Sequence, residues 1–305
     1  MSDKTRKTMS GVHCAVATPV TQDGAIATNL FLEHCRALLR EGCHGLAPLG
    51  TTGEANNFGL SERMALLDAM IEGGIDPSIL IPGTAALSVS DTITLTAHAA
   101  NAGTKGALLL PPFYYKEPDD EGLYRYYSRV IEGVANDDLR MVLYHIPQIS
   151  FVPISHDLIH RLMRAFPGIV CGIKDSSGDL ENMQTMCRRF PDLAVLAGAD
   201  PMMLDVLQAG GAGCITATTN VGPGPLRTVW DNWQDSTKAE VIDAAQEEIV
   251  AWRALANSYA QIPTTKAMIG RIRGDMTWTN LRPPFVEISD EERADVFAKM
   301  AALET

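Results

Sequence analysis

The sequence predicts an α/β fold, a (β/α)8 TIM barrel with a C-terminal helical extension. Short apolar runs alternate with longer helical patterns, and eight such runs follow one another at near-even spacing up to residue 217. Strands that alternate with helices build parallel sheets, and eight such pairs fit a closed barrel better than an open, doubly wound sheet. We expect the barrel to span residues 11–222 and the extension residues 223–305, within one structural unit.

Each expected strand is a short apolar run that ends at a loop. The eight runs are His13–Thr18, Gly45–Pro48, Ile79–Gly83, Ala107–Leu110, Arg140–Tyr144, Ile169–Lys174, Ala194–Ala197 and Gly213–Ala217. Helical patterns lie between them at 28–41, 61–74, 89–102, 121–135, 155–165, 179–188 and 200–208. Ser61 and Ser155 stand where N-caps are expected. In the extension, a long amphipathic helix is expected at 236–258, and Ser289 opens a last one.

The composition is typical of a soluble globular protein, with 46% hydrophobic and 20% charged residues among 305. The net charge of -12 disfavours nucleic acid as a partner, because phosphate binding needs a basic surface. No apolar run approaches the ~20 residues that cross a membrane. Residues 1–10 have no apolar segment behind them, unlike a signal peptide. We therefore expect a cytoplasmic protein without a nucleic-acid or membrane partner.

Metal sites and disulfides are not expected. None of the six cysteines forms a Cys-x-x-Cys pair, and several lie inside apolar runs, as reduced core cysteines do. His156 and His160 are four residues apart on an expected helix, but no third ligand is in view.

Lys174 is the strongest candidate for chemistry. It closes the apolar run Ile169–Lys174, and a loop rich in Asp, Ser and Gly follows at once. The active site of a barrel lies at the C-terminal ends of the strands, which is where this lysine falls. An amine in an apolar site loses its proton more readily and attacks carbonyl groups. A lysine that snorkels from the strand end to solvent fits the local pattern equally well.

Aromatic residues follow the two preceding strands. Tyr144 ends the strand before that of Lys174, and a phenol beside an amine or imine can shuttle protons. A tyrosine at a strand end is more often a packing residue, so its weight here comes from the neighbouring lysine. The cluster Phe113-Tyr114-Tyr115 could line the pocket, carry a proton relay or form a subunit contact.

The turn Gly50-Thr51-Thr52-Gly53-Glu54 follows the second expected strand. Its two hydroxyls and several backbone N–H groups suit a carboxylate, which needs converging donors. A plain turn into the next helix is the alternative. No Gly-Lys-Ser/Thr follows, so the turn is not a phosphate-binding P-loop.

These motifs resemble those of the dihydrodipicolinate synthase/N-acetylneuraminate lyase family of Schiff-base aldolases, from about Val16 to Val221. The matching segments are Thr18-Pro19 with Asp23-Gly24, Gly50–Glu54, Pro112–Tyr115 with Glu121–Leu123, Tyr144–Pro147, Gly172–Asp179 and Gly213–Thr216. The resemblance implies a (β/α)8 barrel with a helical extension, assembled as a homotetramer of tight dimers. It also implies that no metal or organic cofactor is required.

The resemblance implies a role for Lys174 as the amine that forms a Schiff base with C2 of pyruvate or another 2-oxo acid. Tyr144 would be the proton shuttle. Thr52 would link it to Tyr115, which in the family often comes from the adjacent subunit.

The remaining implied roles concern the pyruvyl group. Thr51 and Thr52, in the turn that begins at Gly50, would hold the carboxylate. Ile215 would face the pyruvyl group through its backbone.

Departures from the family motifs bear on the other half of the substrate. Dihydrodipicolinate synthases carry an arginine for the carboxylate of aspartate semialdehyde where this chain has Ile149, which cannot form that ion pair. Sialic acid lyases carry Asp-Glu where this chain has Asp200-Pro201. His145 stands in place of the usual asparagine. We expect Asp200, Ser176 and His145 to contact the tail of the substrate.

The expected activity is a lyase that cleaves a 2-keto-3-deoxy sugar acid or 4-hydroxy-2-oxo acid to pyruvate and an aldehyde, or condenses them. Alternatives within the family are a 2-keto-3-deoxy sugar acid dehydratase and dihydrodipicolinate synthase itself. A catalytically silent barrel that binds a 2-oxo acid as a sensor is the alternative from another class.

Overall fold

The strands form one curled parallel sheet in the computed structural model, which describes residues 9–304. Among these residues the strands are β1 (Gly11–Cys14), β2 (Gly45–Leu46), β3 (Ala107–Leu109), β4 (Met141–His145), β5 (Val170–Asp175), β6 (Ala194–Ala197) and β7 (Gly213–Thr216). Their order in the sheet is β2-β1-β7-β6-β5-β4-β3, and every pair is parallel.

The segment expected as a third strand closes this sheet into a barrel. Leu80 forms a parallel bridge with Leu46 of β2, and Gly83 forms one with Leu108 of β3. The N–H of Leu108 donates to the carbonyl of Pro82 at 2.8 Å. Because Pro82 has no N–H of its own, it cannot donate to a ladder, and the segment pairs through isolated bridges. The predicted (β/α)8 fold class is confirmed.

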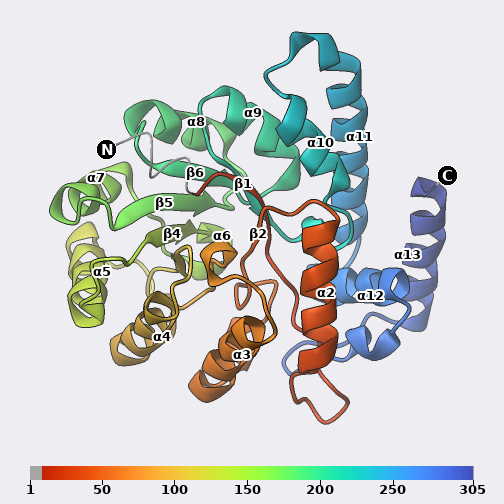
Figure 1. The fold of residues 1–305 in the computed structure, drawn as a ribbon, viewed down its shortest axis with the longest axis horizontal. Coiled ribbons are helices and arrows are strands. Elements are labelled where there is room, and N and C mark those ends of the chain that lie inside the picture. The colour runs from red at the N-terminus through yellow and green to blue at the C-terminus, as the bar shows by residue number, and fades with distance from the viewer. Residues whose placement is uncertain (1–8, 305) are drawn as a thin grey trace.

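Helices surround the sheet (Figure 1). The helices that follow strands are α2 (Thr28–Arg40), α3 (Leu60–Glu72), α4 (Val89–Asn101), α5 (Asp120–Val134), α7 (His156–Ala165), α8 (Leu180–Arg189) and α9 (Met203–Gln208). The expected cap Ser155 accepts the N–H of Leu158, whereas Ser61 lies inside α3, whose N-cap is Gly59. A four-residue helix, α6 (Pro147–Ser150), directly follows β4.

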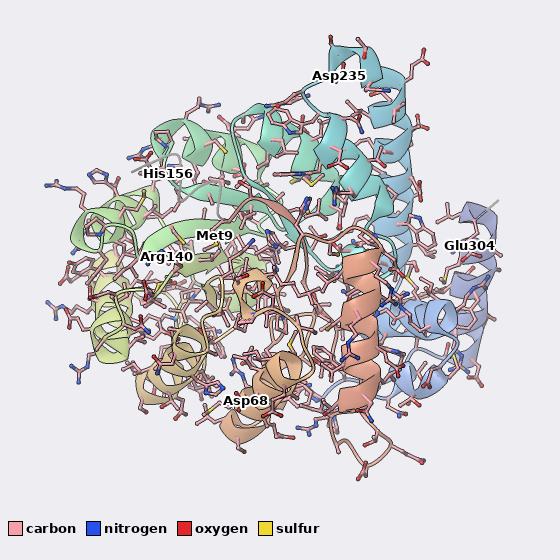
Figure 2. The ribbon with its side chains drawn as sticks, viewed as in Figure 1. Met9, Asp68, Arg140, His156, Asp235 and Glu304 are labelled. Carbon is pink, nitrogen blue, oxygen red and sulfur yellow. The ribbon has the colours of Figure 1, made fainter. Side chains whose placement is uncertain are left out.

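The C-terminal helices lie together on one side of the barrel, next to α2 (Figure 1). They are α10 (Gly224–Asn232), α11 (Ala239–Ala256), α12 (Gln261–Arg273) and α13 (Asp290–Leu303). Figure 2 shows Asp235 at the outer end of this group and Glu304 at the end of α13. Short 3-10 helices occur at Ala55–Asn57, Pro77–Ile79, Asp200–Met202, Thr218–Asn220, Ser236–Lys238 and Met276–Thr279.

The interior of the barrel is a packed apolar core. Its members lie on the strands or directly next to them, and Met9, labelled in Figure 2, also belongs to it. They include Ala15, Ala47, Ile81, Leu108, Val142, Tyr144, Leu196 and Ile215. Inward-facing side chains fill a barrel of this size, which leaves space for chemistry only at its mouth.

Disulfides, metal-binding clusters and membrane-spanning helices are all absent from residues 9–304. The six cysteines, all among the described residues, are buried and form no disulfide. Within residues 9–304, no group of three or more His, Cys, Asp or Glu side chains is arranged to hold a metal ion. Over the same residues no helix is long and apolar enough to cross a membrane.

Candidate active site

Lys174 and Tyr144 are brought together by the β4–β5 ladder. The two residues are direct partners in the parallel register, and both face the barrel interior. The Nζ atom of Lys174 lies 4.3 Å from the centroid of the Tyr144 ring. Both residues are buried, with exposed fractions of 4% and 3%. An ammonium at this distance is attracted to the face of the ring, and the interaction strengthens where water is absent.

The phenol of Tyr144 has an altered acidity. Its Oη atom shares a hydrogen bond of 3.3 Å with Oγ1 of Thr51. Burial by itself raises the pKa of Tyr144, but the charge of Lys174 and the hydroxyls of Thr51 and Ser176 outweigh burial, so the pKa falls below its usual value. A phenol whose anion is stabilised in this way is suited to accept and return protons.

The turn that carries Thr51 is strained at both ends. Leu49 and Glu54 have φ angles of 59° and 55°, in the left-handed region that residues other than glycine rarely adopt. Such conformations cost about 1–3 kcal/mol each and persist where the surroundings over-determine them. A Cβ at Gly83 would lie 2.1 Å from the carbonyl oxygen of Leu49, and one at Gly53 would lie 2.8 Å from that of Val16. The turn is therefore held tightly against neighbouring backbone.

The structure corrects one assignment within this turn. Thr52 was expected to link Tyr144 to Tyr115, but Thr51 forms the hydrogen bond to Tyr144. Thr52 is buried. Only one of two consecutive side chains in so tight a turn faces the phenol, and the sequence does not say which one.

Tyr115 lies at the surface of this single chain, so its expected role with a second subunit stays a prediction. It is 78% exposed and lies edge-on against Tyr114, which is exposed as well. Neither lines the cavity next to Tyr144, whereas Phe113 does. The segment 111–119 contains no helix or strand, and the rest of residues 9–304 leaves the two tyrosine rings largely uncovered. The expected relay from Tyr144 to Tyr115 is therefore not formed within one chain.

His145 lies outside the barrel, contrary to its expected contact with the substrate. Successive side chains of a strand point to opposite faces, so the residue after the inward-facing Tyr144 points outward. The Nδ1 atom of His145 accepts the N–H of Ile154 at 3.1 Å. Burial lowers the pKa of His145, although the nearby carboxylate of Asp175 opposes this. The ring thus supports the loop before α7 instead of the site.

Asp200 holds the extension against the barrel. Its Oδ2 atom accepts hydrogen bonds of 3.0 Å from Oγ1 of Thr218 and from Nη1 of Arg253 on α11. The Asp200 side chain is buried and does not line the cavity. The Oδ2 atom is engaged in an ion pair with Arg253, and the expected contact of Asp200 with the substrate tail stays a prediction.

The other expected residues lie at or next to the site. The Ser176 hydroxyl sits over Gly198, where an added Cβ would come within 2.0 Å of the serine Oγ. Ile215 is fully buried in the same interior cluster as Tyr144. Gly50 and Ile149 line the cavity, and Ile149 is also exposed at its rim.

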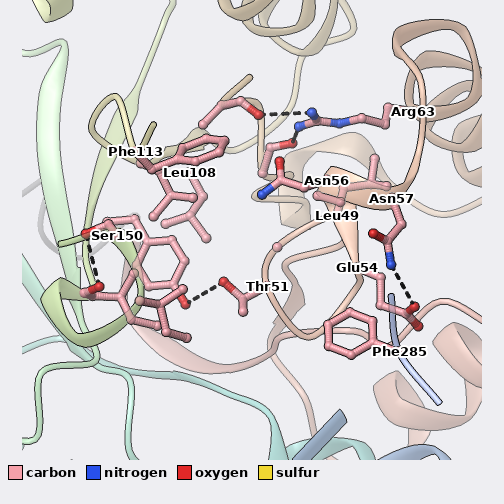
Figure 3. Close-up of a pocket in the computed structure, with 18 of the residues that line it drawn as sticks. Leu49, Thr51, Glu54, Asn56, Asn57, Arg63, Leu108, Phe113, Ser150 and Phe285 are labelled. Atoms are coloured by element: carbon pink, nitrogen blue, oxygen red, sulfur yellow. Dashed lines mark hydrogen bonds between the residues drawn. The ribbon is translucent and has the colours of Figure 1, made fainter. Parts of the chain in front are cut away.

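A cavity of about 220 Å³ opens above this group (Figure 3). Thr51 and Tyr144 line it, whereas Lys174 contacts the Tyr144 ring and is not among the lining residues. Phe113 and Phe285 supply much of its apolar wall. The cavity is large enough for a small organic acid, and its polar lining includes Thr51 and Tyr144 together with Arg63, Asn56 and Asn57.

Sequence analysis missed Arg63, which also lines this cavity. Its guanidinium donates to the carbonyls of Ala85 and Gly83, both at 2.9 Å, and burial lowers its pKa to about 10. A signal was present in the sequence, because Arg63 shares the helical spacing of the buried residues Leu66, Leu67 and Met70.

A second missed feature is an ion pair beneath the strained turn. Nζ of Lys266, on α12, lies 2.8 Å from Oε1 of Glu54, and neither side chain is exposed. Lys266 interrupts a buried helical stretch that continues with Ala267, Met268 and Ile269. A lysine beside such an apolar run was the available signal.

The barrel, the lysine at a strand end and the tyrosine on the neighbouring strand are the features that the sequence motifs led us to expect. A profile of the dihydrodipicolinate synthetase family matches residues 8–303, and the chain belongs to this family. It is 34% identical over 285 residues to an uncharacterized DapA-like lyase from Chloroflexus aurantiacus, covering 93% of both chains.

Two further relatives carry the name of a synthase. The chain is 36% identical to the 4-hydroxy-tetrahydrodipicolinate synthase of Rhodospirillum centenum over 228 residues, 74% of this chain and 76% of that protein. It is similar to the crystal structure of dihydrodipicolinate synthase from Agrobacterium tumefaciens str. C58, with a TM-score of 0.86 and 32% identity. That match covers 97% of this chain and 99% of the other.

Proposed function

We propose that this protein is a Schiff-base lyase that interconverts a 2-keto-3-deoxy sugar acid, or a related 4-hydroxy-2-oxo acid, with pyruvate and an aldehyde. The single observation that carries the proposal is the buried amine of Lys174 at 4.3 Å from the Tyr144 ring, at the C-terminal end of neighbouring strands. An amine and a phenol held together away from water are the two groups that imine chemistry on a 2-oxo acid requires.

The reaction begins when Nζ of Lys174 attacks C2 of the 2-oxo acid. Tyr144 gives a proton to the former carbonyl oxygen, which leaves as water, and a protonated imine remains. In cleavage, the Tyr144 phenolate then takes the proton of the C4 hydroxyl. The C3–C4 bond breaks, its electrons move into the imine to form an enamine, and the aldehyde departs. Protonation at C3 and hydrolysis release pyruvate and restore the amine.

Thr51 and the turn around it serve two purposes in this scheme. The hydroxyl of Thr51 holds the phenol of Tyr144 in place and stabilises its anion. The backbone N–H groups and hydroxyls between Gly50 and Thr52 receive the substrate carboxylate. The protein has a net charge of -12 and therefore does not attract an anion over a long range. Local hydrogen-bond donors must bind the substrate carboxylate instead.

Residues at the rim of the cavity bind the part of the substrate that leaves as the aldehyde. Ile149 offers no cation at the rim, and the guanidinium of Arg63 is already held by two backbone carbonyls. We therefore propose an uncharged, hydroxylated aldehyde as the partner of pyruvate. Synthesis of 4-hydroxy-tetrahydrodipicolinate from pyruvate and aspartate semialdehyde is the second candidate, because relatives at 34–36% identity carry that synthase name.

The products identify the reaction. Supplied with a panel of 2-keto-3-deoxy sugar acids, the lyase releases pyruvate and an aldehyde in equal amounts, which NMR detects directly. A dehydratase would consume the same acids and lose water without releasing pyruvate. A synthase would leave the acids untouched and consume aspartate semialdehyde with pyruvate. Either of the last two outcomes would replace the proposed reaction.

We also propose that the active protein is a homotetramer of tight dimers. Tyr114 and Tyr115 are exposed beside the cavity, with Phe151 and Leu87 among the other exposed large apolar residues. Apolar side chains gathered near an active site are typical of a subunit interface.

A further inference from the structure

A buried ion pair joins the strained turn of the active site to the C-terminal extension. Lys266 Nζ and Glu54 Oε1 are 2.8 Å apart, although the residues are 212 positions apart in the sequence. Both side chains are completely buried. Figure 3 shows Glu54 at the edge of the cavity, where it also accepts a hydrogen bond from Asn57.

Stability alone is a poor explanation for this pair. Removing two charges from water is costly, and well-packed apolar residues of similar volume are often as stabilising as a buried ion pair. The three residues that follow Lys266 on α12, Ala267, Met268 and Ile269, are apolar and buried. Burial lowers the pKa of Lys266, and the attraction of Glu54 opposes this. An ion pair that stays buried despite this cost points to a role in positioning the turn that carries Glu54.

The geometry concerned is that of Thr51. Glu54 closes the turn, because its N–H donates to the carbonyl of Thr51 at 3.1 Å, and it does so in the left-handed conformation. The hydroxyl of Thr51 in turn contacts the phenol of Tyr144. A continuous series of short contacts therefore runs from Lys266 through Glu54 and Thr51 to Tyr144.

We propose that Glu54 and Lys266 are positioning residues that hold the turn 49–54 so that Thr51 meets Tyr144. The extension is thereby part of the catalytic machinery, although none of its helices supplies a reacting group. This inference rests on the proposed imine chemistry for its kinetic consequences, but its structural consequence can be measured without any reaction.

The test compares three variants with the unmodified protein. Glu54→Met combined with Lys266→Met removes both charges and keeps the volume. Glu54→Gln keeps an oxygen that accepts from Lys266, and serves as the conservative variant. Arg273→Met is the matched control, since it cuts an ion pair between the same helix and Glu41 of α2, away from the turn.

Two readouts are taken on each folded variant, with thermal unfolding as the check on folding. Amide hydrogen exchange of residues 49–58 measures how firmly the turn is held. Exchange of the pyruvate methyl protons into heavy water measures enamine formation, and its dependence on pyruvate concentration separates turnover from binding. A displaced proton-transfer group should lower turnover by about 10-fold or more, with a smaller change in half-saturation.

The expected order of turnover is unmodified protein, then Glu54→Gln, then the double Met variant, with faster amide exchange in 49–58 following the same order. Arg273→Met should match the unmodified protein in both readouts. Equal turnover and equal amide protection in the double variant and the unmodified protein would overturn the proposal. If the double variant does not fold, Lys266→Met alone takes its place, and unchanged turnover and amide protection in that variant would decide against the proposal in the same way. Absence of methyl exchange in the unmodified protein would refute the imine chemistry. Amide exchange would still test whether the Glu54–Lys266 ion pair holds the turn 49–54.

Discussion

Thr51 and Tyr144 share a hydrogen bond of 3.3 Å across the mouth of the barrel, between a turn after β2 and the strand β4. The contact joins the proposed carboxylate-binding turn to the proposed proton shuttle. Burial alone would raise the pKa of Tyr144, but the charge of Lys174, followed by this contact with Thr51, lowers it. Four predictions concern this arrangement and its surroundings, and a fifth concerns the amine of Lys174.

Tyr144→Phe should keep the fold and lower turnover by about 100-fold or more, because a positioned proton-transfer group is lost. The ring that packs against Lys174 remains, so thermal unfolding should change little. Steady-state release of pyruvate from the best 2-keto-3-deoxy sugar acid measures the effect. Turnover within twofold of the unmodified protein would remove Tyr144 from the mechanism.

Thr51→Val should move the pH profile as well as the rate. The hydroxyl of Thr51 lowers the pKa of Tyr144, so its removal raises that pKa. If the phenolate is the proton acceptor, activity rises as pH passes this pKa. The rising limb of the profile should therefore shift to higher pH in Thr51→Val.

Thr52→Val is the matched control, because Thr52 lies in the same turn and the hydrogen bond to Tyr144 belongs to Thr51. Its pH profile should coincide with that of the unmodified protein. A shift in Thr52→Val and none in Thr51→Val would restore the original sequence-based assignment.

Arg253→Met should affect stability and spare pyruvate chemistry. It leaves the buried carboxylate of Asp200 without its cation, which costs about 3 kcal/mol of unfolding free energy. Urea unfolding measures this loss. Arg273→Met breaks a pair whose acid, Glu41, is well exposed, and should cost about 1 kcal/mol or less. Half-saturation by pyruvate should be unchanged in both variants, and a large rise in Arg253→Met would return Asp200 to the substrate site.

Ile149→Arg should improve the use of aspartate semialdehyde. The new guanidinium would lie at the rim of the cavity and could pair with the carboxylate of this aldehyde, a gain of about 1.5–3 kcal/mol for a charge-assisted hydrogen bond. Condensation rates with pyruvate are compared between the two proteins. Efficient condensation by the unmodified protein would show that Ile149 does not exclude this substrate.

The fold was predictable because the barrel repeats one simple pattern. Apolar runs placed Lys174 and Tyr144 at neighbouring strand ends, and the register bears out that adjacency. The third strand, Ile79–Gly83, was also identified, although Pro82 limits it to isolated bridges. These features follow from hydrophobicity and spacing along the chain, which a single sequence contains.

The details of the site were less predictable, for identifiable physical reasons. His145 follows Tyr144 on one strand, and the alternation of strand side chains should have excluded one of them from the interior. Asp200 pairs with Arg253, 53 residues away, which no local pattern reveals. Lys266 and Glu54 are farther apart still. Ion pairs between distant segments depend on how helices pack, and the sequence pattern does not encode their partners.

The central claim is that the amine of Lys174 forms an imine with a 2-oxo acid. The most direct measurement incubates the protein with pyruvate, reduces it with borohydride, and maps the adduct by digestion and mass spectrometry. Lys174→Met is the control that should take up nothing. We expect one reduced pyruvyl group per chain, on Lys174. An unmodified Lys174, or an adduct confined to other lysines, would contradict the account.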